Sequence, residues 1–410
     1  MQTQLPKRFT DSPAGAEAER ILRSCVHCGF CNATCPTYQL LGDELDGPRG
    51  RIYLIKRMLE GEPAGAGTRL HLDRCLTCRA CETTCPSGVE YGRLLDIGRA
   101  HAESATVRPR RERLLRRLLC AVLPFPGRVR AALALSRWFG ALLPSALVRA
   151  VPARLRPERT DAYHWPAPRH ARRVLILDGC VQSVTHAHIN AAAARLLDRY
   201  GVSLVRVAGV SCCGAVTHHL SQDAATRTFM RRNIDTWWPE VDRGAEAIVT
   251  TSSACSVMVK DYGHLLRDDP DYAAKARRIA ALAGDITDVV AGLGLEPRRA
   301  AGAPGRVAFH APCSLQHGLR AHAVVENLLR GAGYELTPVA DSHLCCGAAG
   351  TYSILQPDLS GQLLANKLAA LEVAAPAVIA SANIGCLIHL QGGARTRGRH
   401  WIELIEEAYP

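Results

Sequence analysis

Long apolar runs are absent from this sequence. None of its 410 residues belongs to a stretch approaching the about 18 uninterrupted apolar residues that a membrane-spanning helix needs. Residues 1–20 also lack the apolar core of a secretory signal. We therefore expect a cytoplasmic protein in a reducing compartment, where cysteines more often bind metals than form disulfides.

Sequence signatures for nucleotide cofactors are absent as well. Neither G-x-G-x-x-G nor G-x-x-x-x-G-K-[ST] occurs, so we expect no flavin and no NAD on this chain. No acid–base pair stands out as catalytic. Five polar residues lie near cysteine motifs and are interpreted as supporting or surface residues: Asp178, His218, His219, His310 and His343.

Aromatic residues are scarce, at 5%, but 48% of the residues are hydrophobic and 21% are charged, which is enough apolar surface to build ordered cores. At roughly 150 residues per domain, the length favours two or three domains.

Eight of the 17 cysteines form two copies of one pattern, C-x2-C-x2-C-x3-C-P. This is the bacterial ferredoxin run for a pair of [4Fe–4S] clusters, in which the fourth cysteine of each run binds the other cluster. A pair of zinc knuckles is the alternative, but two full runs with a trailing Cys-Pro favour the clusters. The expected ligands are Cys25, Cys28, Cys31 and Cys85 for the first cluster and Cys75, Cys78, Cys81 and Cys35 for the second.

Residues between and after these runs show helical spacing. Apolar side chains recur at helical intervals in residues 48–59 and 91–100. We expect an α-helical ferredoxin-like domain over residues 1–105, in which helices clamp the clusters.

The C-terminal part of the chain repeats a second cysteine pattern. In each copy a cysteine is followed after 32 positions by Cys-Cys-Gly, and one more cysteine comes 42 or 40 positions later. Four β-like runs alternate with helical stretches, which favours an α/β region of two repeated βαβ modules with mainly parallel strands. We expect the first module over residues 173–295 and the second over residues 303–410, with the cysteines at strand ends.

The cysteines of these modules are candidate metal ligands. They are Cys180, Cys212, Cys213 and Cys255 in the first module, and Cys313, Cys345, Cys346 and Cys386 in the second. Each set suffices for an additional iron–sulfur cluster or a zinc ion, and a duplicated fold with inert buried cysteines is the alternative. Cys120 belongs to neither pattern.

Four segments together resemble the iron–sulfur subunits of glycolate oxidase (glycolate dehydrogenase). They are Cys25-VHCGFCNATCPTYQLLGDELDGPRGRIYLIK, Asp73-RCLTCRACETTCPSGVEYGRLLDIGR, Asp341-SHLCCGAAGTY and Ala382-NIGC. The resemblance covers nearly the whole chain, except residues 106–173. It implies an electron-transfer subunit of an oxidoreductase complex that converts glycolate to glyoxylate, with two flavin-domain subunits as partners and a quinone or another acceptor downstream.

Two positions depart from the fullest form of the Cys-Cys-Gly module, which occurs in the B subunit of heterodisulfide reductase. In that form the last cysteine completes a C-x2-C pair, whereas Ser252 and Asn383 stand at the partner positions here. A five-cysteine non-cubane cluster is therefore excluded. Two other functions stay open: a related lactate or glycerol-3-phosphate dehydrogenase subunit, and a non-catalytic iron–sulfur scaffold or redox sensor.

Positive charge is concentrated in one segment. Residues 106–173 hold 16 Arg, no Lys and three acidic residues, so the rest of the +12 chain is close to neutral and we expect no nucleic-acid partner. Within an Arg-rich linker over residues 106–172, Arg108–Arg117 and Arg128–Leu143 have amphipathic helical patterns. Such helices can contact anionic lipid on the cytoplasmic face of the inner membrane, or they can dock partner subunits or cover the ferredoxin-like domain.

Overall fold

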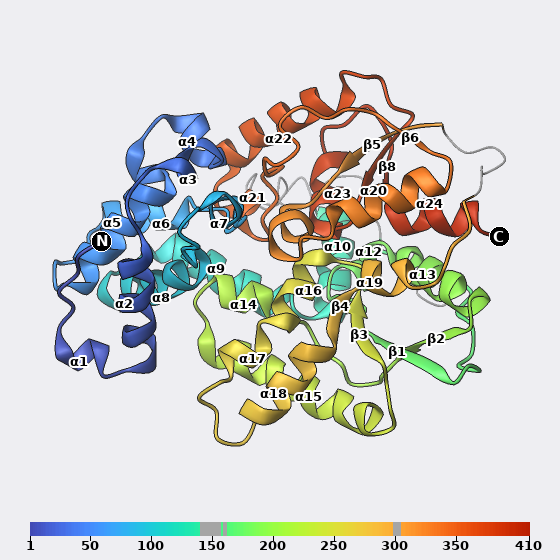
Figure 1. Cartoon of the computed structure of the whole chain (residues 1–410), viewed down its shortest axis with the longest axis horizontal. Helices are drawn as coiled ribbons and strands as arrows, with labels where there is room; N and C mark the ends of the chain where they lie inside the picture. The colour runs from blue at the N-terminus through green and yellow to red at the C-terminus, as the bar shows by residue number, and fades with distance from the viewer. Residues whose placement is uncertain (140–156, 159–161, 298–304) are drawn as a thin grey trace. The chain divides into compact units, whose positions relative to one another are not determined.

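The computed structural model describes residues 1–139, 157–158, 162–297 and 305–410 (Figure 1). The chain forms two compact units. Unit 1 comprises Met1–Arg116 and His343–Lys367, and unit 2 comprises Arg117–Ser342 and Leu368–Pro410. Leu142 and Leu143, which belong to the expected second amphipathic stretch, lie outside the described residues.

Unit 1 is helical, as the sequence predicts. Proline opens four of the helices described for it, at Pro13, Pro36, Pro48 and Pro357, where a fixed φ suits the first helical turn. The helices are α1 (Lys7–Thr10), α2 (Pro13–Ser24), α3 (Phe30–Ala33), α4 (Pro36–Leu41), α5 (Pro48–Leu59), α6 (Ala66–Asp73), α7 (Ala80–Thr84), α8 (Tyr91–Ala105) and α21 (Tyr352–Leu355), with the first parts of α9 (Arg110–Val122) and α22 (Pro357–Glu372).

The core of unit 1 joins α2, α5 and α8. Ile21, Ile55 and Leu94 are fully buried in it. A Cβ atom at Gly98 of α8 would lie 2.7 Å from the Ile55 side chain, so glycine permits the close approach of α5 and α8. These packed helices hold the cysteine loops between them.

Unit 2 contains two four-stranded parallel sheets with the same topology (Figure 1). The first sheet has the order β2-β1-β3-β4, and the second has the matching order β6-β5-β7-β8. The repeated parallel architecture predicted from the sequence is therefore confirmed at this level. The strands are β1 (Arg172–Ile176), β2 (Val202–Arg206), β3 (Ala247–Thr250), β4 (Ala283–Asp285), β5 (Arg306–His310), β6 (Glu335–Leu336), β7 (Val378–Ser381) and β8 (Gly398–His400).

Helices cover both sheets, and one buried apolar cluster includes strands of each repeat. Val174 of β1, Phe309 of β5 and Ala380 of β7 belong to this cluster. The main helices are α12 (Gln182–Thr185), α13 (Ala187–Arg199), α14 (Ala215–His219), α15 (Asp223–Asp242), α16 (Ser253–Lys260), α17 (Tyr262–Leu265), α18 (Ala273–Leu282), α19 (Ile286–Ala291), α20 (His322–Gly331), α23 (Ile384–Gln391) and α24 (Trp401–Ala408). The shared core makes the two repeats one folded body.

Within the described residues of the Arg-rich segment, the chain forms α9 and α10 (Pro126–Phe139). No single helix among the described residues is long and apolar enough to span a membrane, although α9 and α10 pass that test as a bent pair. On α9, Leu114 is 69% exposed. Arg108 is buried instead in ion pairs with Asp73, Glu103 and Glu112.

Candidate metal centres

The two ferredoxin runs adopt the same unusual backbone. His27 and Gly29 in the first run have φ angles of 59° and 87°. Their counterparts in the second run, Thr77 and Arg79, have φ angles of 55° and 62°. A left-handed backbone costs a non-glycine residue about 1–3 kcal/mol and is retained where the surroundings require it. Its repetition indicates that both loops wrap around something at their centre.

The first predicted ligand set lines one hollow. Cys25, Cys28, Cys31 and Cys85 line it, and Cys81 and Tyr91 also border it. Cys25 is buried and Cys28 is exposed. Three cysteines of the first run thus meet the last cysteine of the second.

The second predicted ligand set lines a neighbouring hollow of about 390 Å³. It contains Cys35, Cys75, Cys78 and Cys81. Cys35, Cys75 and Cys81 are buried in this set, whereas Cys25 is the one buried cysteine of the first set. Each run thus places its fourth cysteine in the hollow that is lined by the first three cysteines of the other run.

The surroundings of these thiols suit iron–sulfur clusters. Burial raises the pKa of Cys31 to about 11, so a thiolate at that position needs a positive partner, which iron ions supply. The hydroxyl of Tyr352, which is close to Cys75, is buried and has no hydrogen-bond partner among the described residues. A phenol oxygen buried without a partner indicates that a group with acceptor atoms, such as a cluster sulfur, belongs beside it.

The first Cys-Cys-Gly module brings its cysteines together in unit 2. The Sγ atoms of Cys180 and Cys212 lie 3.5 Å apart. Hydrogen bonds from the thiols of Cys180 and Cys213, and then from nearby backbone N–H groups, lower the pKa of Cys212. Cys213 in turn hydrogen-bonds to Cys255. The four thiols therefore form a connected group that favours a thiolate, the form that binds metals, at Cys212, whereas the pKa values of Cys180 and Cys213 are raised by their hydrogen bonds and by burial.

Glycine forms the same left-handed turn in both Cys-Cys-Gly motifs. Gly214 and Gly347 have φ angles of 92° and 90°. Their backbone N–H groups donate to the sulfurs of Cys212 and Cys345 at 3.5 and 3.4 Å. A side chain at either position would strain this turn, because the left-handed region favours glycine.

The second module distributes its cysteines differently. Cys313 caps the π-helical turn Ser314–Gly318 after β5, and Cys386 lies on α23, where its sulfur accepts a 3.3 Å hydrogen bond from Asn383 Nδ2. Cys345 and Cys346 belong to His343–Lys367, the segment that folds with unit 1.

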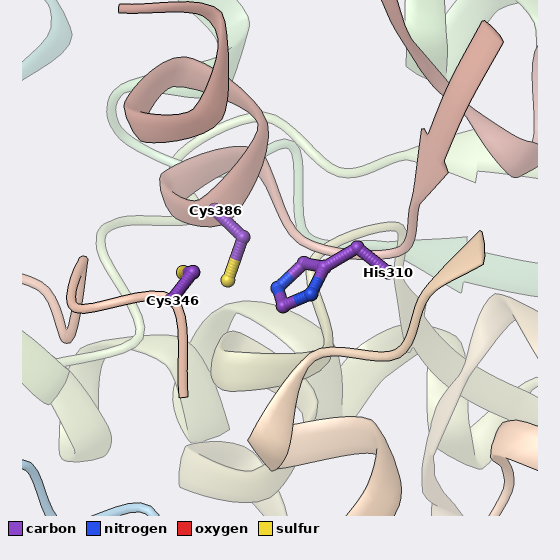
Figure 2. Close-up of side chains that lie close together, drawn as sticks. All are labelled: His310, Cys346 and Cys386. Atoms are coloured by element: carbon purple, nitrogen blue, oxygen red, sulfur yellow. The ribbon is translucent and has the colours of Figure 1, made fainter. Parts of the chain in front are cut away.

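Figure 2 shows His310 at the end of β5 and Cys386 on α23, both in unit 2. His310 is buried, at 2% exposure, so the surface role that the sequence interpretation allowed for it is wrong. The sequence offered one signal of this burial: His310 ends a β-like run three residues before Cys313, at the position where the first repeat has Leu177.

Two known domain families match this chain. The 4Fe-4S dicluster domain matches residues 21–89, and the Cysteine-rich domain matches residues 174–260 and 307–391. The first match covers both ferredoxin runs, and the other two cover the repeated modules.

Known proteins extend the similarity to the whole chain. The glycolate oxidase iron-sulfur subunit of Escherichia coli (strain K12) is 50% identical over 408 residues, which cover 100% of this chain and 99% of that protein. The probable glycolate oxidase iron-sulfur subunit of Bacillus subtilis (strain 168) is 30% identical over 94% of both chains. Lactate utilization protein A of Bacillus licheniformis is 30% identical over only 58% of this chain. The chain therefore belongs to the family of glycolate oxidase iron–sulfur subunits.

Proposed function

We propose that this chain is the electron-transfer subunit of a glycolate-oxidising complex and that unit 1 carries two [4Fe–4S] clusters. The observation that carries this proposal is the sorting of the ferredoxin cysteines into two hollows that exchange their fourth ligands. When bound, such clusters accept and release one electron at a time. The proposed ligands are Cys25, Cys28, Cys31 and Cys85 for the first cluster, and Cys35, Cys75, Cys78 and Cys81 for the second.

The redox balance requires a second kind of subunit. Oxidation of glycolate to glyoxylate removes two electrons and two protons, and the electrons leave the carbon together as a hydride. A flavin can accept that hydride and release its electrons singly, whereas a thiolate-bound cluster cannot accept it. We therefore place the hydride acceptor on flavin-containing partner subunits and assign this chain the single-electron relay to a quinone or another acceptor.

The Cys-Cys-Gly modules form the exit half of this relay in our proposal. The connected thiols of Cys180, Cys212, Cys213 and Cys255 support a further iron–sulfur cluster or a zinc ion there. Replacing Cys212 and Cys213 together by Ser should leave flavin reduction by glycolate unchanged and slow electron delivery to the acceptor. Delivery at the parental rate would instead make the module structural.

We also propose that α9 contacts a membrane surface. Leu114 and Leu118 of α9 are 69% and 42% exposed, and Arg110, Arg111, Arg113 and Arg117 are exposed beside them. Such a surface suits anionic headgroups, with about 1 kcal/mol gained per basic residue near the lipid. Flotation with anionic vesicles should occur at low salt and weaken at high salt, because salt screens these charges. If the chain ignores anionic vesicles at low salt, α9 instead packs against or docks a partner subunit.

Reconstitution with the flavin-containing subunits tests the function directly. Anaerobic addition of glycolate should bleach the cluster absorbance of this chain only when those subunits are present. Lactate and glycerol-3-phosphate, added separately, should reduce it much more slowly. Equal or faster reduction by lactate would favour the second candidate, a lactate-linked subunit, which the similarity to lactate utilization protein A supports over about half of the chain. Iron without reduction by any of the three would favour a scaffold or redox sensor.

A further inference from the structure

Arg51 is almost completely buried beside the second ligand set, with only 1% of its side chain exposed. Its Nη1 atom donates toward the Cys35 sulfur at 3.9 Å, and its Nε atom donates to the carbonyl oxygen of His71 at 2.7 Å. Its Nη2 atom donates to Thr37 Oγ1 at 3.1 Å. The guanidinium is therefore held in one orientation by several acceptors, and one of its donors faces a proposed cluster ligand.

The charge around Arg51 is not fully balanced by its nearest acid. Asp46 is completely buried, and its Oδ1 atom lies 3.3 Å from Nη2 of Arg51. The same carboxylate also accepts a 2.8 Å hydrogen bond from Arg74, and a 3.0 Å contact joins it to Nδ1 of His71. One carboxylate thus serves two guanidinium groups. The surplus positive charge remains next to Cys35, where burial keeps it from being screened by water.

Two tyrosine hydroxyls add further donors at this site. Tyr91 and Tyr352 are 4% and 6% exposed. The Tyr91 hydroxyl hydrogen-bonds to Cys75, and the Tyr352 hydroxyl has no hydrogen-bond partner among the described residues. Burial and then the neighbouring Cys75 thiol raise the pKa of both tyrosines, which keeps them protonated as donors. Tyr352 lies in the His343–Lys367 segment, which folds as part of unit 1.

The surroundings of the first ligand set differ. Cys28 is exposed, and its neighbours Val26 and Phe30 are 67% and 61% exposed. The nearby Arg49 is paired with Glu44 at 2.6 Å, and both side chains are more than a third exposed. This pair is neutral and accessible to water, so its influence is weaker than that of a buried cation.

From this asymmetry we propose that Arg51, assisted by Tyr91 and Tyr352, makes the cluster at Cys35, Cys75, Cys78 and Cys81 the stronger electron acceptor of the two. Reduction adds negative charge to a cluster, and nearby positive charge and hydrogen bonds to its sulfurs raise its potential. Burial acts in the opposite direction, but it also strengthens the attraction from Arg51. Electrons that reach the first cluster then pass on to the second.

This inference rests on the proposed ligand sets, and its test is a redox titration followed by electron paramagnetic resonance on the full chain. Cys28→Ser and Cys78→Ser identify the signals of the first and second clusters. In the parent, the second cluster should become reduced at the higher potential. Arg51→Met should shift that potential downward and leave the first cluster unchanged. Arg49→Met, on the same helix, is the matched control and should not move the second cluster.

If Arg51→Met does not fold, Tyr91→Phe and Tyr352→Phe still test the inference, because each removes only a hydroxyl. Each should lower the potential of the second cluster by less than Arg51→Met does. A parent in which the second cluster has the lower potential would overturn the inference, as would unchanged potentials in the folded Arg51 and tyrosine variants. A chain purified without oxygen that shows no cluster signals would overturn the proposed function as well.

Discussion

Ser252 donates a 2.6 Å hydrogen bond to the side-chain oxygen of Asn383, its counterpart in the second repeat. Both side chains are buried, at 4% and 9% exposure. Asn383 uses its amide nitrogen to donate to the Cys386 sulfur. The two positions where fuller modules have cysteine therefore contact one another and link the repeats of unit 2.

Removing one partner of this pair should cost more than removing both. Ser252→Ala leaves the buried Asn383 oxygen without its donor, at about 1–3 kcal/mol of unfolding free energy. The double variant with Ser252→Ala and Asn383→Leu should lose less unfolding free energy than the two single variants lose in sum. A double-mutant cycle measures this difference. All five tryptophans of the chain lie in unit 2, so tryptophan fluorescence during denaturation reports on this unit. Additive single effects would show that the two side chains do not interact in solution.

The exchange of ligands between the ferredoxin runs predicts that cysteine substitutions have non-additive effects on the iron content of the chain. Cys35→Ser should reduce the iron of these two clusters from about eight to about four atoms per chain. Adding Cys78→Ser should remove little more, because both changes affect one cluster, whereas adding Cys28→Ser should remove most of the remainder. Iron analysis of anaerobically purified protein measures this, with Cys85→Ser as the control that reverses the pattern. If adding Cys28→Ser to Cys35→Ser removes little more iron, while adding Cys78→Ser removes most of the remainder, each run binds its own cluster.

The two Cys-Cys-Gly turns should differ in their tolerance of a methyl group. Gly214→Ala has no atom closer than 3.6 Å to the new Cβ, so it should cost only the left-handed backbone strain of about 1–3 kcal/mol. Gly347→Ala places the Cβ 2.7 Å from the carbonyl oxygen of Ser360 and should cost more. Thermal unfolding followed by circular dichroism should show the larger loss for Gly347→Ala. Equal losses would mean that the turn around Gly347 relaxes.

Acid should destabilise unit 2 through His400. Burial lowers the pKa of this histidine to about 3, from an ordinary value of 6.5. As pH falls below 6.5, the unfolded chain binds the proton first, so stability is present above that pH and is lost between pH 6.5 and 3. The loss at pH 5 should be about 2 kcal/mol.

His400→Gln is the comparison variant for this effect. It should be less stable near neutral pH, because His400 Nε2 contacts the Thr251 carbonyl oxygen at 2.8 Å. Its unfolding free energy should nevertheless fall less between pH 7.5 and pH 5 than that of the parent. A parallel pH dependence of parent and variant, by tryptophan fluorescence, would assign the acid sensitivity to other groups.

Local spacing was sufficient to predict much of this molecule. The C-x2-C-x2-C-x3-C-P runs predict loops that gather cysteines, because ligands that wrap one centre must be close along the chain. The helix expected at residues 48–59 is α5 (Pro48–Leu59). Likewise, the repeated β-like runs and cysteine intervals predict two parallel modules, because each repeat folds through the same local periodicity.

Other features depend on residues that are far apart in the sequence. The pattern within α5 places Arg51 on the same face as Ile55, which was the available signal that this cation is buried, but its acceptors Thr37, Asp46 and His71 come from other segments. Only the tertiary structure brings Ser252 to Asn383, 131 positions away. It alone also groups His343–Lys367 with unit 1 and so places Tyr352 near Cys75. Sequence periodicity specifies which face of an element is buried, whereas the partner that covers the face is selected by packing of the whole chain.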